Sequence, residues 1–161
     1  MIRLSDAKRV HLGHVHEADA RWRLYAFADA VDPRNPAPRQ NALMDFLAGP
    51  NPPVAKYTPA GWDTGSVFDV RAILQQLHLE LDWVEMHDFR KPRTGPLGLI
   101  DYEKVFCPVP GTDGDIFDLR GIDRGAGGLV VVRPDQYVAL NLPLDGYDEL
   151  DAFFGRFMNP A

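Results

Sequence analysis

Residues 127–144 have the sequence GGLVVVRPDQYVALNLPL, and this stretch determines how the rest of the chain can fold. It contains a run of four apolar residues, Leu129–Val132, of which three are β-branched. Such a run is typical of a strand that is buried on both faces. Pro134 and Asp135 follow, and a proline that presets φ beside a short polar residue predicts a turn.

Alternation between the two faces of a strand begins after this turn. The residues on its apolar face are Val138, Leu140, Leu142 and Leu144. A period of two predicts a strand over residues 137–142 that pairs antiparallel with a strand over residues 129–133. Pro143 cannot donate a backbone hydrogen bond, which places the second strand at the edge of a sheet.

An amphipathic helix is predicted over residues 146–158, directly after this hairpin. Asp145 is a favourable N-cap, and Asn159 and Pro160 would end the helix. One stripe of the helix is apolar, with the spacing i, i+3, i+4, i+7 and i+8: Leu150, Phe153, Phe154, Phe157 and Met158. We expect the three phenylalanines of this stripe to pack on the sheet.

The rest of the chain supplies further strands and helices. The same periodicities predict strands over residues 22–28, 66–74 and 102–109, a helix from Pro38 to Gly49 that buries Ala42, Leu43, Phe46 and Leu47, a weak helix within residues 75–89, a short helix or turn near residues 116–122, and turns at residues 32–36 and 111–114. Residues 1–20 are expected to form an extended lead-in.

These elements predict an α/β fold in a single domain of residues 1–161. At its centre we expect a mixed sheet of about four or five strands flanked by helices, as in other layered α/β domains. The β-hairpin and the C-terminal helix close this fold. Several α/β folds end in such a unit, and the thioredoxin fold is one of them.

The composition is that of an ordinary globular chain, and it excludes several classes of function. The 161 residues suffice for one domain, and a net charge of −6 argues against a nucleic-acid partner. No apolar segment approaches the roughly 20 residues that a membrane span needs, so no membrane partner is expected. The single cysteine, Cys107, suggests a reducing compartment, and without a signal-peptide pattern the predicted location is the cytoplasm.

Three histidines of the lead-in, His11, His14 and His16, could bind a metal by residue type. Their spacing of i, i+3 and i+5, however, suits neither one face of a helix nor one face of a strand. A metal site also needs more ligands than this segment clearly offers. We interpret them as ordinary polar histidines and predict no metal site.

A glycine-rich segment, with Gly125, Gly127 and Gly128, resembles a loop that could cradle a phosphate. Phosphate-binding loops follow a strand and open a helix, whereas this segment opens a strand. Loop flexibility therefore explains these glycines better than cofactor binding.

Cys107 lies in an apolar run over residues 105–109 with no second cysteine to pair with. A redox thiol needs a cationic neighbour, a helix N-terminus or a CxxC partner to lower its pKa. We expect a buried, inert thiol whose pKa is raised by burial.

Charged residues gather in two places, and both are expected to face solvent. The acidic group consists of Glu80, Asp82, Glu85 and Asp88, and the basic group lies at residues 90–93. GxSxG, HExxH and GxGxxG motifs are all absent from the sequence. We therefore predict no catalytic, cofactor-binding or metal-binding residue.

Six segments together resemble a known domain across essentially the whole chain. They are LSDAKRVHLGH (4–14), RWRLYAFAD (21–29), VFDVRAIL (67–74), DYEKVFC (101–107), DIFDLRGID (115–123) and LVVVRPDQYVALNLPLD (129–145). This set is similar to the C-terminal domain of the phenol hydroxylase family of flavoprotein aromatic hydroxylases.

The resemblance implies a thioredoxin-like fold without the CxxC motif, linked in that family to dimerisation. FAD and NADPH act in the upstream regions of the family enzymes, so no cofactor is expected in this chain. The expected function is a non-catalytic dimerisation or structural domain that self-associates or docks to a flavin-monooxygenase region. The apolar residues of the lead-in, Ile2, Leu4, Val10 and Leu12, are the surface expected to associate.

The alternative is a free-standing thioredoxin-fold protein with a redox or small-ligand-binding function. A fold alone does not decide between these two functions. A reactive Cys107, or a pocket with convergent polar groups, would favour the alternative.

Overall fold

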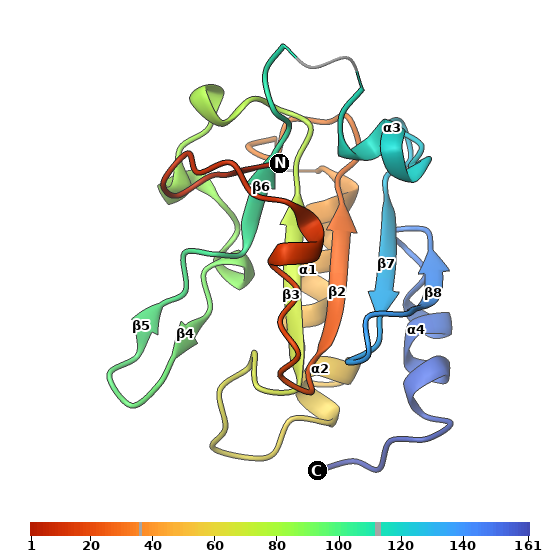
Figure 1. Ribbon diagram of the computed structural model, residues 1–161. Helices are drawn as coiled ribbons and strands as arrows, with labels where there is room; N and C mark the ends of the chain where they lie inside the picture. Colours follow the sequence, from red (N-terminus) through yellow and green to blue (C-terminus); the bar gives the residue numbers. More distant parts are fainter. Residues whose placement is uncertain (36, 112–113) are drawn as a thin grey trace.

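A computed structural model describes residues 1–35, 37–111 and 114–161 and shows a mixed α/β architecture. Six strands form the main sheet in the order β1-β6-β3-β2-β7-β8, whereas the sequence predicts about four or five. Figure 1 shows helix α1 behind this sheet and the N-terminal segment crossing its near face. The turns predicted at residues 32–36 and 111–114 extend in part outside the described residues.

The elements have the following bounds. The strands of the main sheet are β1 (Ile2–Arg3), β2 (Trp22–Phe27), β3 (Phe68–Ile73), β6 (Val105–Cys107), β7 (Gly128–Val132) and β8 (Val138–Leu142), and a separate two-stranded sheet contains β4 (Arg93–Thr94) and β5 (Leu99–Ile100). The helices are α1 (Arg39–Ala48), α2 (Pro53–Lys56), α3 (Ile116–Arg120) and α4 (Tyr147–Phe154), with 3-10 turns η1 (Leu12–His14), η2 (His78–Glu80), η3 (Trp83–Glu85) and η4 (Asp88–Arg90).

Strand β2 lies in the middle of the sheet and is buried on both faces. It pairs parallel with β3 on one side and antiparallel with β7 on the other. The alternation in its sequence therefore separates two buried layers, not a buried face and a solvated one. Leu24 and Ala26 lie in one of these layers, and Arg23, Tyr25 and Phe27 lie in the other.

The main core lies between the sheet and helices α1, α2 and α4. Helix α1 ends at Gly49 as predicted, but its inward face differs from the expected one. Gln40 and Met44 are buried there, while Ala42 is exposed. Gln40 can be buried because its amide donates to the carbonyl of Ala26 at 2.6 Å, which satisfies the polar group.

The predicted hairpin is confirmed, and its second strand lies at the sheet edge as expected. Leu129 pairs with Leu142, and Val131 pairs with Leu140. A bulge between Val131 and Val132 then shifts the register, so that Val132 faces Val138. This bulge moves Val138 to the opposite face from Leu140, where it is 59% exposed. The prediction that Val138 shares the buried face was wrong for this reason.

The C-terminal helix is shorter than predicted. Helix α4 begins after Gly146, not after a capping Asp145, and it ends at Phe154 before Asn159 is reached. Phe154 is fully buried, as the stripe predicted, whereas Phe157 lies beyond the helix and is half-exposed. Both rings contact Trp22, with centroids 5.1 Å and 5.6 Å from its ring.

The lead-in is part of the sheet and its second layer. Ile2 is buried in β1, while Val10 and Leu12 pack against the cluster that contains Phe27, Phe106 and Phe117. Helix α3 covers the same face beside this segment. The expectation that the apolar residues of the lead-in form a free associating surface was therefore wrong, because these side chains close the domain's own core.

Residues 75–100 form no α-helix. The weak helical pattern of residues 75–89 becomes the three 3-10 turns η2, η3 and η4, which cover the β6 side of the sheet. Strands β4 and β5 then form a small hairpin that projects from the body of the domain (Figure 1). Leu97 and Leu99 on this projection are exposed.

Candidate functional site

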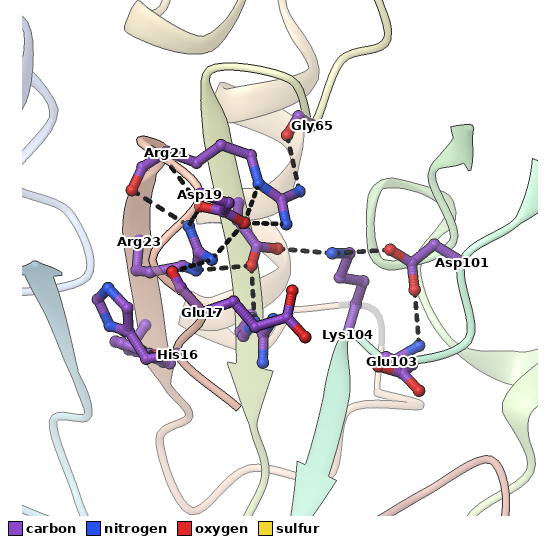
Figure 2. A network of polar contacts seen from close by, with 12 residues as sticks. His16, Glu17, Asp19, Arg21, Arg23, Gly65, Asp101, Glu103 and Lys104 are labelled. Carbon is purple, nitrogen blue, oxygen red and sulfur yellow. Dashed lines mark hydrogen bonds and ion pairs between the residues drawn. The ribbon is translucent and has the colours of Figure 1, made fainter. Parts of the chain in front are cut away.

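A cluster of buried charges lies on the face of the sheet that the lead-in covers (Figure 2). Arg23 of β2 and Asp69 of β3 are both fully buried, and the Arg23 Nε lies 2.9 Å from Asp69 Oδ2. Arg71 donates to the same oxygen at 2.8 Å, and Lys104 donates to Asp69 Oδ1 at 2.6 Å. One carboxylate thus holds three cations from three neighbouring strand segments.

The lead-in closes over this cluster and supplies further partners. Asp19 accepts two hydrogen bonds from the Arg23 guanidinium, at 2.8 Å and 2.9 Å, and the carbonyl of Glu17 accepts a third at 3.2 Å. Arg21 pairs with Asp19 at 2.6 Å and reaches the carbonyl of Gly65. These contacts fasten residues 17–21 to the sheet (Figure 2).

The positive charges decide the protonation state of Asp69. Burial by itself would raise the pKa of this carboxyl, but Arg71, Lys104 and Arg23 outweigh burial and hold the pKa below its usual value. Asp19 behaves likewise, because hydrogen bonds from Arg23 and Arg21 overcome burial and lower its pKa. Every carboxylate of the cluster is paired, which is the condition for burying charge at all.

This cluster was not predicted from the sequence. Arg23, Asp69 and Arg71 occupy alternate positions in two strands whose remaining positions are apolar, and that pattern predicts a solvent-facing side. One signal in the sequence was available: a positive charge on one strand and a negative charge on the next strand, on the same face, can form a pair. The cluster joins β2, β3, the residue before β6 and the lead-in to one another by ion pairs, so we assign it a structural role.

The three candidate histidines do not converge. His11 and His14 are exposed, and the His11 Nδ1 accepts from the backbone N–H of Gly13. His16 is buried beside Tyr25, whose hydroxyl lies 3.5 Å from the His16 Nδ1. Burial, with help from the charges of Arg23 and Arg71, lowers the pKa of His16. Within the described ranges, no three His, Cys, Asp or Glu side chains are placed to share a metal.

The glycine-rich segment has a packing role that flexibility does not explain. Gly127 has φ of 67°, and a Cβ there would lie 2.6 Å from the carbonyl oxygen of Phe27 and 2.7 Å from a methyl of Leu144. Only glycine lets this backbone approach β2 so closely. The close approach to β2 therefore explains the glycine at position 127.

Cys107 is fully buried in β6, and burial raises the pKa of its thiol to about 12. The direction is the one expected from the apolar run around it. The thiol therefore stays protonated at neutral pH, and the thiolate is the form that attacks disulfides and peroxides.

The two charged groups of residues 80–93 have different outcomes. Glu80, Asp82, Glu85 and Asp88 are exposed, as predicted. Arg90 was expected in solvent but is 2% exposed, and it donates to the side-chain oxygens of Gln40 at 2.5 Å and Asn41 at 2.7 Å. Burial lowers the pKa of Arg90 to about 10. This arginine joins the 75–90 segment to helix α1.

A groove of about 550 Å³ runs between the lead-in, the end of α3 and the β7–β8 hairpin. His16 and Tyr25 line its floor, and Val130, Val132 and Val138 line the hairpin side. The Nε2 of His16 is buried there and makes no hydrogen bond with the described residues. The groove thus combines an apolar wall with polar side chains, which include Arg120, Gln136 and Asn141 as well as His16.

The two edges of the main sheet differ. At the β1 edge, residues 8–10 fold back and cover the strand. The backbone N–H of Arg3 donates to the carbonyl of Lys8, and the backbone N–H of Val10 donates to the carbonyl of Met1. At the other edge, β8 pairs with β7 alone among the strands of residues 1–35, 37–111 and 114–161. The sequence of β8 is VALNL, which carries no charge.

With this geometry in place, the chain can be assigned to a family. It belongs to the family described as "Phenol hydroxylase, C-terminal dimerisation domain", which matches residues 1–161. The expected family resemblance is therefore confirmed over the entire chain.

Three of its relatives are monooxygenases. The chain is 49% identical over 160 residues to a 3-hydroxybenzoate 4-monooxygenase of Comamonas testosteroni, with 98% of this chain and 25% of that protein covered. It is 29% identical over 161 residues to an FAD-dependent monooxygenase (terD) of Aspergillus terreus, with 98% and 26% covered. A phenol 2-monooxygenase (fsqG) of Aspergillus fumigatus is 25% identical over 157 residues, with 96% and 25% covered.

The chain thus spans about a quarter of the length of these relatives. It corresponds to their dimerisation domain, and not to a whole monooxygenase. Among the described residues, no helix is both long enough and apolar enough to cross a membrane.

Proposed function

We propose that this chain is the dimerisation domain of an aromatic hydroxylase that uses FAD and NADPH, and that it catalyses no reaction itself. The observation that carries this proposal is the match of a dimerisation-domain family to all 161 residues. Hydroxylation, and the binding of both cofactors, would take place in regions other than these residues. Docking to such a flavin region is part of the same proposal.

We further propose that the fold is thioredoxin-like. The order β3-β2-β7-β8 supports this assignment, because a parallel β2–α1–β3 unit is followed by an antiparallel hairpin and a final helix, α4. Strands β1 and β6 would then be additions to this framework. The sequence carries one cysteine, so the domain has the framework without the CxxC chemistry.

The environment of Cys107 argues against the redox alternative. A thiol with a pKa of about 12 reacts slowly at neutral pH. Labelling of the native chain with a thiol reagent at pH 7 should be slow and should become rapid only after denaturation. Rapid labelling of the folded chain would shift the assignment towards a redox protein.

Sedimentation of the purified chain across a concentration series tests the main proposal. We expect a reversible dimer whose population rises with concentration, and a colourless preparation without stoichiometric FAD. A chain that stays monomeric at every concentration would contradict dimerisation. A yellow preparation loaded with FAD would contradict the assignment of flavin binding to other regions.

A further inference from the structure

We propose that two copies of this chain associate through strand β8, edge to edge and antiparallel, so that their main sheets become continuous. This inference rests on the proposed dimerisation function and adds the surface that performs it. It replaces the lead-in, which the sequence suggested as the associating surface and which the structure shows to be packed on its own sheet.

The two edges of the main sheet differ in how well they are protected. A free edge presents unpaired N–H and C=O groups, and monomeric proteins protect such edges with short strands, charges or covering segments. Strand β1 has all three: it is two residues long, Arg3 pairs with Asp6 and Glu103, and residues 8–10 cover it. Strand β8 has five residues and none of these protections.

Strand β8 is also compatible with a copy of itself. Residues 137–142, YVALNL, contain no charged side chain, so the antiparallel pairing of two such strands meets no like-charge repulsion. Pro143, which lacks an N–H, lies just past the end of the strand and so does not interrupt it. A two-fold axis through an antiparallel pair brings the same surface of each copy together, as closed dimers require.

Exposed apolar side chains flank the β8 edge. Tyr137 is 73% exposed and Val138 is 59% exposed. Val138 also forms part of the wall of the groove beside the hairpin. Pairing of two β8 strands would bring these side chains towards the partner copy, and burying apolar surface is the main driving force of association. The occupant that fits the edge and the flank together is a second copy of this chain.

Hydrogen exchange of the β8 amides, measured on the 161-residue chain at low and high concentration, tests the pairing directly. Alternate residues of an edge strand direct their N–H groups away from the sheet, so these amides exchange rapidly when the edge is free. We expect the outward amides of residues 138–142 to become protected as the dimer forms. The amides of β1 should not change with concentration.

The variant Val138→Lys supplies a second measurement. A lysine tolerates this exposed position but places like charges close to the two-fold contact, so the dissociation constant should rise at least about ten-fold. Leu79→Lys is the matched control: Leu79 is 83% exposed, lies on η2, and should leave the constant unchanged within about two-fold.

The outcomes separate this inference from the function on which it rests. A dimer whose β8 amides stay unprotected, and which Val138→Lys does not weaken, would overturn the β8 interface but leave dimerisation intact. A strict monomer would overturn both. Protection of β8 together with a selective effect of Val138→Lys supports both.

Discussion

The two sides of the main sheet are stabilised by different means. On the β1–β6–β3 side, ions hold the lead-in to the sheet, with Asp69 paired to Arg23, Arg71 and Lys104. The C-terminal part of the chain, with β7, β8 and helix α4, is held by apolar packing instead, and Phe154 is buried at its centre against Trp22 and Phe68. The ionic side has its edge covered by its own chain, while the apolar side ends in an open strand.

This difference indicates where a partner can be accepted. Buried charges are satisfied only in one geometry, so the ionic side has one arrangement of its side chains. Apolar contacts and an open strand edge do not require one fixed side-chain geometry, because a strand of another copy can supply the backbone hydrogen bonds and the apolar surface. The charges beside an edge strand and the length of that strand, more than its place in the sheet, decide which edge stays open.

The largest effect is expected on the apolar side. Phe154→Ala should lower the free energy of unfolding by about 3–5 kcal/mol, because its ring is fully buried against Trp22 and Phe68. Phe157→Ala is the matched control, since that ring is 53% exposed, and its cost should be far smaller. Urea unfolding monitored by fluorescence measures both. Equal costs would mean that the packing around α4 is not as described.

The ionic side should respond almost as strongly to the loss of one charge. Asp69→Asn leaves the buried Arg23, Arg71 and Lys104 without their shared carboxylate, which should cost about 3 kcal/mol or more. As a control, Asp32→Asn removes an exposed partner of Arg34 and should cost less than about 1 kcal/mol.

Both unfolding free energies come from the same urea titration. If Asp69→Asn proves as mild as the control, the cluster contributes little to stability, and the proposed contrast between the two sides would fail.

A smaller effect concerns pH and His16. The pKa of His16 is lowered by burial and by Arg23 and Arg71, while Asp19 and Asp69 oppose this shift. Between the lowered folded pKa and the unfolded value of 6.5, the unfolded chain binds the additional proton. Stability should therefore fall as the pH is lowered through this window. Asp69 and Asp19, whose pKa values are also lowered, should add a further loss as the pH falls below 3.8.

Thermal unfolding at a series of pH values measures this dependence. His16→Gln should remove the loss that begins near pH 6.5, whereas His14→Gln, at an exposed position, should keep it. A pH profile that is the same in both variants would show that His16 is not the responsible group.

The smallest effect is expected at the covered edge. Arg3→Ala removes ion pairs with Asp6 and Glu103 at the surface, and should cost at most about 1 kcal/mol. It should not create a new association, because residues 8–10 still cover the backbone of β1. Larger oligomers of this variant in sedimentation would mean that charge, and not the covering segment, closes this edge.

The sequence determined the elements whose periodicity is local. The hairpin at 129–142, the strand at 22–28 and the burial of Phe154 and Cys107 follow from runs and alternations of a few residues, which record how each segment meets a core. The family assignment was also available from the sequence, because the matching segments extend along the whole chain.

Only the tertiary structure decided which polar residues lie inside. Arg23, Asp69 and Arg90 have ordinary charged side chains, and their burial depends on partners that are up to 50 residues away. The bulge that turns Val138 outward, and the approach to β2 that requires glycine at position 127, likewise depend on neighbouring strands. A local pattern specifies which face of an element is apolar, but the tertiary fold determines which element packs against that face. The open edge of β8 likewise follows only from the pairing of all the other strands of the sheet.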